Sequence, residues 1–315
     1  MTVSWAIKGG FSLLALLLCM GWMQDLHPIF DSPTHFRLHF VALLLALSLI
    51  LLLLGAWRWF LAGGAIALIS IALTTPFLPS LNSVAAHSLN APLPSGQKPL
   101  RLVQLNIHYL NDTPQRTATI ISSANPDVVI LQEITLRNDT LLQELEADLP
   151  HQIVCHRQGV GSVGILSKHP FVDPNQNLCL RHLGFAKARI GFRDKELTVA
   201  SFHSRWPWPF SQRRQIGFLK EEFKALQHPL IVAGDFNAAP WSSAVQRVAK
   251  LTRTHLPEHL LFTWSSHFAP LKNTIGPVLP IDQTMASQQV EFVDRRLLPE
   301  AGSDHLPVLS DVIIR

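Results

Sequence analysis

The N-terminal 89 residues are almost wholly apolar, and this segment limits what the chain can fold into more than any other feature. Its charged side chains are Lys8, Arg37, Arg58, Asp25 and Asp31. An apolar helix of about 20 residues is long enough to cross the hydrocarbon layer of a bilayer, which is roughly 30 Å thick. Residues 1–89 are therefore expected to form a transmembrane anchor in front of a soluble domain.

Three apolar runs predict three transmembrane helices, near residues 5–24, 38–56 and 59–78. The first run reaches spanning length if the long side chain of Lys8 extends to the membrane interface. A cleavable signal peptide is the alternative for this run, because signal peptides also begin with a basic segment. The sequence Gly21–Gln24 is not a small-x-small cleavage site, and two further runs follow, so three membrane helices are favoured.

Charges beside these runs favour one orientation of a multi-pass protein. With three spans, Lys8 and Arg58 lie on the same side of the membrane, and basic residues favour the cytoplasmic side. The soluble domain is then expected to be extracytoplasmic. Lys98 and Arg101, shortly after the third run, favour the opposite orientation.

The remainder of the chain has an ordinary soluble composition. Three of the 26 Lys and Arg residues and two of the 22 Asp and Glu residues lie in residues 1–89, which leaves 23 basic and 20 acidic residues. This balance lacks the strong positive charge of a dedicated duplex-DNA binder. Cys155 and Cys179 could pair in an extracytoplasmic domain, or could be two buried free thiols.

Residues 90–99, which are rich in Pro, Ser and Gly, predict a linker, and residues 100–315 predict one domain. The expected strands are 100–107, 128–131, 152–155, 163–167, 186–192, 197–202, 229–233, 281–286, 290–295 and 308–314. The expected helices are 115–124, 139–149, 211–227 and 242–251. Strands alternate irregularly with helices, and several neighbouring strands have hairpin spacing. This order favours an α/β domain with mixed sheets and helices outside them.

Polar side chains lie at the C-terminal ends or at the edges of several of these apolar strands. They are Asn106, Glu133, His203, Asp235 with Asn237, and Asp304 with His305. Ligand sites in α/β sheets gather at strand ends. A single residue of this kind is typically a cap or a turn former. The group together combines carboxylates, amides and imidazoles, which suit metal-assisted phosphoryl chemistry.

An ordered series of short motifs runs through the soluble domain. The motifs are Leu105–Ile107, Leu131–Glu133, Gly164–Ser167, Phe202–His203, Gly234–Asn237, Pro280–Asp282 and Gly302–His305. In this order and spacing they resemble the endonuclease/exonuclease/phosphatase superfamily of DNase I-like hydrolases, over residues 100–315. The nearest likeness is to bacterial members with N-terminal membrane helices. The resemblance implies a four-layer sandwich of two mixed sheets flanked by helices, attached to a bacterial inner membrane.

The resemblance also implies a divalent-metal phosphoester hydrolase and assigns its metal site. Glu133 would be the main ligand of Mg²⁺ or Mn²⁺, assisted by Asn106. Asp304 would assist at the metal or in its surroundings. Hard oxygen ligands of this kind suit these two cations. Asp235 would orient or deprotonate the attacking water.

The remaining roles concern the phosphoryl group. Asn237 and His203 would donate hydrogen bonds to its non-bridging oxygens. His305 would bind or protonate near the phosphate, and Asp282 would hold the imidazole ring of His305. Gln283 follows Asp282 at a position where many members of the superfamily have a His or a large aromatic residue.

The sequence leaves the natural substrate open. A nuclease-like phosphodiesterase is the leading hypothesis, with a phosphoester substrate and the lipid bilayer as its partners. A phospholipid or sphingolipid headgroup phosphodiesterase is the alternative, because a Trp-rich loop with Arg205 and Trp206 lies beside the predicted site. That loop could instead pack on its own aromatic rings. A third hypothesis is a catalytically silent binding module on a membrane tether. No protein partner is indicated.

Overall fold

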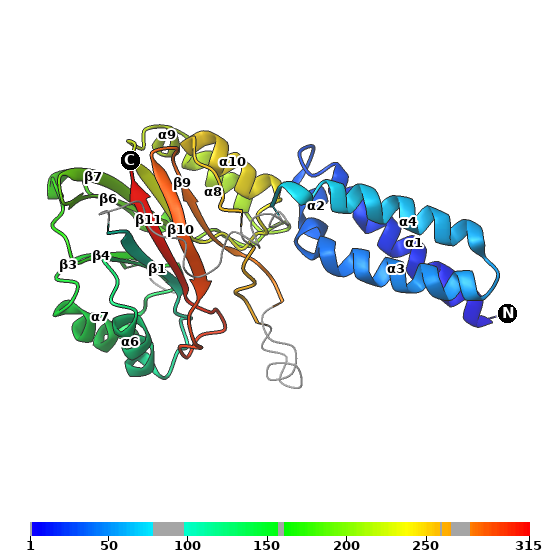
Figure 1. Ribbon diagram of the computed structural model, residues 1–315, viewed down its shortest axis with the longest axis horizontal. Coiled ribbons are helices and arrows are strands. Elements are labelled where there is room, and N and C mark those ends of the chain that lie inside the picture. The colour runs from blue at the N-terminus through cyan, green and yellow to red at the C-terminus, as the bar shows by residue number, and fades with distance from the viewer. Residues whose placement is uncertain (1, 78–97, 157–160, 259, 266–277) are drawn as a thin grey trace.

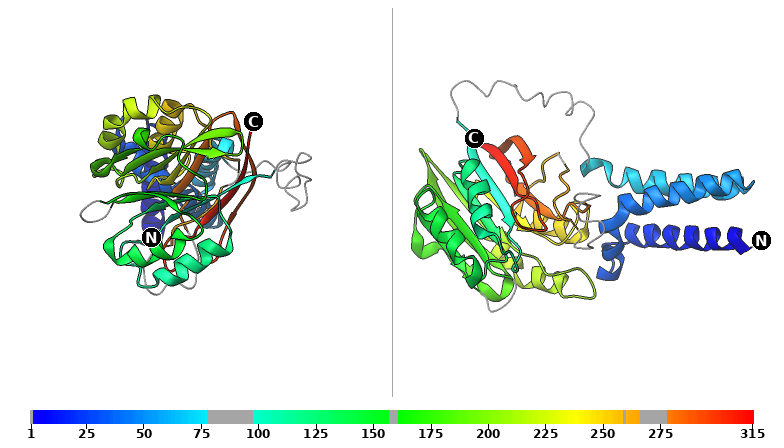
Figure 2. Two further views of the ribbon diagram at one scale, coloured as in Figure 1. Left: turned by 90° about the vertical axis from the view of Figure 1, so that its left-hand side faces the viewer. Right: turned by 90° about the horizontal axis from the view of Figure 1, so that it is seen from below.

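The computed structural model describes residues 2–77, 98–156, 161–258, 260–265 and 278–315, and consists of a helical bundle followed by an α/β domain (Figure 1). The predicted linker at 90–99 lies outside the described residues except for its last two positions. The three long helices of the bundle lie side by side and project from one end of the α/β domain (Figure 2).

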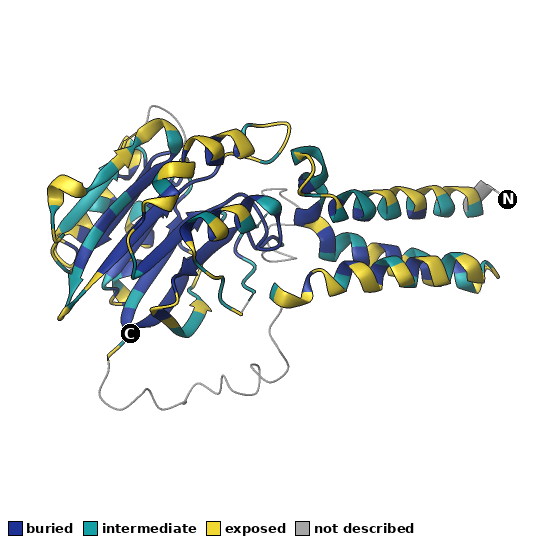
Figure 3. Cartoon of the chain, turned by 90° about the horizontal axis from the view of Figure 1, so that it is seen from above, coloured by how far each residue is buried: buried dark blue, intermediate teal, exposed yellow. Residues whose placement is uncertain are grey.

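The bundle consists of α1 (Thr2–Trp22), α2 (Pro28–Asp31), a 3₁₀ turn (Ser32–Phe36), α3 (Arg37–Leu53) and α4 (Trp57–Ala72). Leu44 and Leu51 of α3 are fully buried between the helices. A Cβ atom at Gly63 would lie 2.0 Å from the Ser48 hydroxyl, so only glycine allows α4 to pack this closely on α3. The outward faces of all three helices remain exposed (Figure 3).

Two segments of the bundle, rather than the predicted three, are long and apolar enough to cross a membrane: Ser4–Trp22 and Pro28–Leu53. The third expected span, 59–78, corresponds to α4, which has 16 residues. Its length is about 24 Å, less than the roughly 30 Å of a hydrocarbon layer. Pro76 lies in the 3₁₀ turn that follows α4, and proline does not continue a helix. Arg37 donates to the Leu73 carbonyl at 3.5 Å and to the Thr74 hydroxyl at 3.4 Å, just beyond the helix end.

The α/β domain contains two mixed sheets. The first has the strand order β10-β11-β1-β2-β4-β3 and the second has the order β5-β6-β7-β8-β9. The strands of the first sheet are β1 (Leu100–Asn106), β2 (Val128–Gln132), β3 (His151–Cys155), β4 (Val163–Ser167), β10 (Val290–Leu297) and β11 (Val308–Ile314). Those of the second are β5 (Leu178–Leu180), β6 (Phe185–Phe192), β7 (Lys195–Phe202), β8 (Leu230–Asp235) and β9 (Asp282–Ala286). The pairs β1–β2 and β7–β8 are parallel, and the other pairs are antiparallel.

The two sheets pack face to face, and helices cover their outer faces. Residues such as Leu102, Ile165, Val199 and Ile231 form the buried layer between the sheets. On the first sheet lie α6 (Pro114–Ser123) and α7 (Asp139–Glu146). On the second lie α8 (Gln212–Phe218), α9 (Lys220–Lys224) and α10 (Ser243–Thr252). This arrangement confirms the predicted four-layer α/β sandwich.

The expected elements differ from the structure in two details. The helix expected at 211–227 is divided into α8 and α9 at Leu219, two residues after Gly217, a residue that weakens helices. Strand β5 was not expected, because it has only three residues. It carries Cys179, which forms a disulfide with Cys155 of β3. The disulfide therefore connects the edge strands of the two sheets.

Candidate active site

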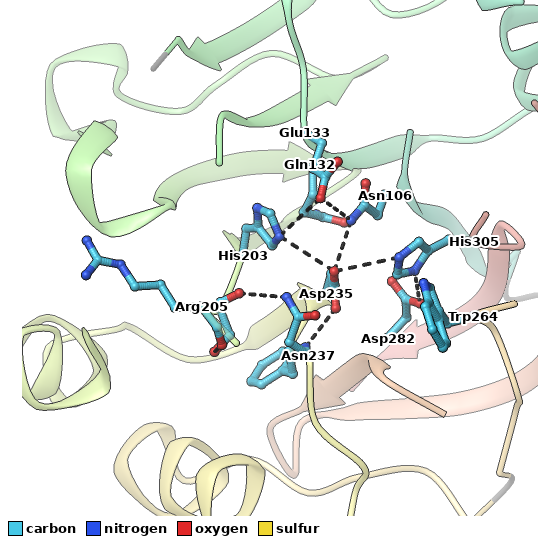
Figure 4. A network of polar contacts seen from close by, with 12 residues as sticks. Asn106, Gln132, Glu133, His203, Arg205, Asp235, Asn237, Trp264, Asp282 and His305 are labelled. Carbon is cyan, nitrogen blue, oxygen red and sulfur yellow. Dashed lines mark hydrogen bonds and ion pairs between the residues drawn. The ribbon is translucent and has the colours of Figure 1, made fainter. Parts of the chain in front are cut away.

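The ends of strands from both sheets meet at one cleft of about 770 Å³ (Figure 4). Asn106 and Asp235 end β1 and β8, Glu133 follows β2, and His203 follows β7. The strands of each parallel pair end at the same edge of their sheet. The hydrogen bond between Asn106 and Asp235 shows that the two edges lie side by side. Asp282 begins β9, and the segment before β11 supplies Asp304 and His305. Asn237, two residues after Asp235, also lines the cleft. All eight residues of the predicted catalytic and metal sites therefore gather around it.

Asp235 lies at the centre of the cluster and is 1% exposed. Its Oδ1 accepts the backbone N–H of Asn237 at 2.7 Å, and its Oδ2 accepts the Asn106 amide at 2.9 Å. The Nε2 atoms of His203 and His305 lie 3.6 and 3.8 Å from the same Oδ2. Burial raises the pKa of Asp235 to about 7, against the opposing charge of His305. The carboxyl group can therefore gain and lose a proton near neutral pH.

Glu133 faces Asp235 across the amide group of Asn106. Its Oε1 accepts from Asn106 Nδ2 at 3.1 Å, and its Oε2 accepts the Tyr109 backbone N–H at 2.9 Å. The backbone of Glu133 is left-handed, with φ of +59°, which directs the side chain into the cleft from the end of β2. Glu133, His203 and Asp235 each place one ligand atom within 4.8 Å of the others. Two carboxylates and an imidazole at this spacing fit a divalent cation.

His305 and Asp282 form a buried pair. The Nδ1 of His305 lies 2.7 Å from Asp282 Oδ2, and Gln104 Nε2 donates to Asp282 Oδ1 at 2.8 Å. Burial lowers the pKa of His305, but the carboxylates of Asp282 and Asp235 outweigh it and raise the pKa to about 10. Burial likewise raises the pKa of Asp282, but the His305 charge and hydrogen bonds lower it below its ordinary value. The pair is therefore an imidazolium and a carboxylate at neutral pH, with Nε2 directed toward Asp235.

Asn237 and Asp304 lie at the rim of the cluster. The amide of Asn237 donates to the Ser204 carbonyl at 2.8 Å, and Asp304 Oδ2 accepts the Trp264 indole N–H at 2.9 Å. Both side chains therefore already have a fixed orientation. Their roles toward a phosphoryl group and a metal remain predictions.

Arg205 and Trp206 line the same cleft, on the segment after His203. The Arg205 guanidinium donates to the Ser211 hydroxyl at 2.7 Å, and the backbone N–H of Arg205 donates to Gln215 Oε1 at 2.7 Å. Trp206 is 58% exposed. Their position beside the site agrees with the sequence, while contact with a substrate remains a prediction.

Three supporting residues escaped the sequence analysis of the site. Gln104 holds Asp282, and Trp264 holds Asp304. Ser303 donates to the Asn106 carbonyl at 2.6 Å and accepts the His305 backbone N–H at 3.0 Å. Gln104 is a polar residue between the apolar Val103 and Leu105, and this was a readable signal of a buried polar network. The indole of Trp264 gave no such signal.

Gly234 is required where β8 passes the end of β7. Its φ is +151°, and a Cβ atom there would lie 1.9 Å from the Phe202 carbonyl oxygen. No other residue allows this approach. The close approach brings Asp235 beside His203, so the glycine of the Gly234–Asn237 motif serves the geometry of the site.

Comparisons with known proteins agree with this geometry. The model of the Endonuclease/Exonuclease/phosphatase family matches residues 103–305. None of the curated proteins matches the sequence.

Solved structures share the fold at low sequence identity. An endonuclease/exonuclease/phosphatase from Beutenbergia cavernae DSM 12333 is 18% identical with a TM-score of 0.54, covering 69% of this chain and 72% of its own. D. rerio TDP2 complexed with a single-strand DNA product is 18% identical with a TM-score of 0.55, covering 69% of this chain and 100% of its own. The chain belongs to the endonuclease/exonuclease/phosphatase family and is a metal-dependent phosphoester hydrolase.

Proposed function

We propose that the protein is a membrane-anchored phosphodiesterase that uses Mg²⁺ or Mn²⁺. The observation that carries the proposal is the convergence of Glu133, Asn106, Asp235 and the His305–Asp282 pair in one cleft, each within hydrogen-bond or ion-pair distance of another member. A cation and fixed donors offset the negative charge that hydrolysis builds on phosphoryl oxygens.

Glu133 would hold the cation, with Asn106 and Asp304 next to it, and the Asp235 carboxyl group would lie beside the cation and take up the proton of the attacking water. The fit rests on the donor set: two carboxylates held close together by one amide, one of them with a pKa raised by burial. Hard oxygen ligands of this kind favour Mg²⁺ or Mn²⁺. When bound, the cation would supply positive charge beside the phosphoryl oxygens.

The other residues would act directly on water and substrate. Asp235 would accept a proton from the attacking water, since its pKa near 7 suits a general base. His305 would enter as imidazolium and give a proton to the departing oxygen. Asp282 would keep the Nδ1 proton in place, so that Nε2 faces the reaction. Asn237 and His203 would donate to the phosphoryl oxygens.

Membrane anchoring is supported by the exposed surface of the bundle. Large apolar side chains point outward along its length, among them Leu13, Leu16, Leu49, Leu53, Leu61 and Leu68. A water-soluble protein rarely exposes so extended an apolar surface. We infer that α1 and α3 cross the bilayer and that α4, although shorter, crosses it again and returns the chain to the side that carries the domain.

An extracytoplasmic position of the domain is supported by two observations. The Cys155–Cys179 disulfide is of a kind that persists in oxidising compartments. Lys8 and Arg58 lie at the end of the bundle farthest from the domain, and basic residues favour the cytoplasmic side. We therefore infer that in a bacterium the protein lies in the inner membrane, with the site outside the cytoplasm.

The proposal is tested by hydrolysis of bis-p-nitrophenyl phosphate with the full-length protein in detergent micelles. We expect turnover with Mg²⁺ or Mn²⁺ that EDTA abolishes. Glu133→Gln should remove this turnover, because the carboxylate charge at the metal is lost. Glu146→Gln, a matched change at an exposed position of α7, should retain it. Turnover that is indifferent to metal or to Glu133 would refute the proposal.

A further inference from the structure

A second, largely apolar groove adjoins the active-site cleft. It has a volume of about 200 Å³ and lies between the bundle and the segment 206–210. Its main lining residues are Phe36, Trp206, Trp208, Phe210, Trp264 and Leu279. Trp206, Phe210, Asn237 and Trp264 line both this groove and the cleft. A ligand could therefore occupy both cavities at once, with a polar part in the cleft and an apolar part in the groove.

The aromatic side chains of the groove are exposed although they are large. Trp206, Trp208 and Phe210 are 58%, 44% and 64% exposed, and Phe36 on the opposite wall is 42% exposed. Exposed apolar area of this kind is costly in water and marks a surface that meets lipid or an apolar ligand. Trp in particular favours the membrane–water interface, because one ring edge is polar.

The groove is held open by hydrogen bonds rather than formed by a loose loop. Gln212 Nε2 donates to the carbonyls of Arg205 and Phe236, both at 3.0 Å. Gln215 fixes the Arg205 backbone from the other side. The Ser32 hydroxyl, from the bundle, donates to the Trp208 carbonyl at 3.0 Å. The segment that carries the aromatic rings is therefore hydrogen-bonded both to the α/β domain and to the bundle.

The bundle wall is fixed to the active-site segment as well. The Trp241 indole donates to the Thr34 carbonyl at 2.7 Å, and His35 Nδ1 accepts the Ala239 backbone N–H at 3.1 Å. Residue 36 directly precedes α3, which runs away from the domain (Figure 1). The groove thus lies at the end of a proposed membrane span, where the bilayer surface would be.

From this placement we propose that the substrate is a membrane lipid with a phosphodiester headgroup, whose apolar part lies in the groove beside Phe36 and Trp208. The inference rests on the proposed phosphodiesterase function and names its substrate class. Water would add to phosphorus while the bond from phosphorus to one ester oxygen breaks. Asp235 would take the proton from water, and His305 would give a proton to the departing oxygen.

Single-stranded nucleic acid is the competing substrate, because bases also stack on exposed aromatic rings. Lipid is favoured for two reasons. One wall of the groove belongs to the apolar bundle, and residues after position 89 are nearly balanced in charge, with 23 basic and 20 acidic residues. A strand of phosphates is normally held along a basic track.

The experiment uses full-length protein in nanodiscs that contain phosphatidylcholine, phosphatidylethanolamine and phosphatidylglycerol, with products followed by ³¹P NMR. Bis-p-nitrophenyl phosphate and single-stranded DNA are measured in parallel. We expect metal-dependent release of a phosphomonoester from at least one lipid. Trp208→Ala and, from the opposite wall, Phe36→Ala should each lower kcat/KM for the lipid about tenfold more than for the soluble diester. Phe218→Ala, an exposed aromatic change on α8, should leave the ratio unchanged.

The outcomes distinguish a failure of the lipid inference from a failure of the proposed phosphodiesterase function. Turnover of the soluble diester without any lipid turnover, or a wide preference for single-stranded DNA, would overturn the lipid inference and retain the phosphodiesterase. An equal loss for both substrates in both groove variants would also overturn it, because the groove would then serve only the fold. Failure to hydrolyse even the soluble diester would instead refute the proposed function.

Discussion

Asp235 contacts several of the other polar residues of the site: Asn106, Asn237, His203 and His305 all lie against its carboxyl group. Burial disfavours its charged form, while the amide of Asn106 and the backbone N–H of Asn237 favour that form. The balance leaves its pKa near 7, so that the group is only partly ionised at neutral pH. A residue in this state can act as a base without a large cost for its buried charge.

Replacement of this carboxyl group by an amide should therefore affect catalysis more than folding. We expect Asp235→Asn to lower kcat about 10³-fold, within the range typical of general-base removal. Its thermal unfolding temperature should change little, because the loss of one of the two accepted hydrogen bonds is offset by the removal of a buried charge. Steady-state kinetics and circular dichroism measure the two effects. Asp148→Asn, at an exposed position, serves as the matched control. Retained activity in Asp235→Asn would exclude the assigned role.

The dependence of kcat/KM on pH should report the ionisation of Asp235 and of His305. Activity should rise as Asp235 loses its proton below about pH 7, because a cation beside the group favours its charged form, and should fall as His305 loses its proton through about pH 10. Asp282 raises the pKa of His305, so Asp282→Asn should move the alkaline limb toward neutral pH. A pH profile of each protein between pH 5 and 11 makes the comparison. An alkaline limb that stays in place would show that His305 is not the acid.

Most polar residues of the site were predictable because Asn106, Glu133, His203 and Asp235 end or follow apolar strands, and strand ends in α/β folds meet at one side. Their supporting residues were less predictable. Trp264 bonds Asp304 from a position 40 residues earlier in the sequence, and no local pattern indicates that contact. The two left-handed backbones at Glu133 and Asn237 were also invisible, because neither residue is glycine.

At the scale of elements, α10 is capped by a side chain from the bundle. Asp31 accepts the backbone N–H groups of Ser243 at 3.0 Å and of Ala244 at 3.2 Å, and it accepts the Ser243 hydroxyl at 2.7 Å. A carboxylate at a helix N-terminus is favourable both as a hydrogen-bond acceptor and through the helix dipole. The cap joins the bundle to the helix that follows the active-site segment.

Removal of this cap should lower the local stability where the bundle meets the first turn of α10. We expect Asp31→Ala to cost roughly 1–2 kcal/mol of local stability, which corresponds to roughly 5- to 30-fold faster amide exchange. Hydrogen exchange at the first turn of α10, measured on the full chain, tests this. Asp25→Ala changes an exposed Asp in the same bundle loop and should leave that exchange unchanged. Equal protection in Asp31→Ala and the parent chain would contradict the capping role.

The sequence indicated most strands and helices within a few residues, since apolar periodicity is local. It did not indicate the junction between bundle and domain, because those hydrogen bonds join residues more than 200 positions apart. The early end of α4 is different, because Pro76 follows it closely and proline does not continue a helix. Apolar composition alone predicted a longer span.

At the scale of the whole molecule, the disulfide between β3 and β5 joins the two sheets. The loop that it closes spans 24 positions, for which chain-entropy arguments give about 3 kcal/mol of stabilisation. We expect Cys155→Ser to lose about this amount in denaturant unfolding, and reductant to have the same effect on the parent chain. Cys19→Ser should change neither result. Insensitivity of the parent chain to reductant would contradict a structural disulfide.

The central claim is that the cleft between the two sheets holds a divalent cation on Glu133, beside Asp235. Anomalous diffraction from crystals soaked in Mn²⁺ tests it most directly. The account predicts one strong peak in contact with the Glu133 carboxylate and next to Asp235, absent from crystals of Glu133→Gln. Peaks only at surface carboxylates, with none in the cleft, would contradict it.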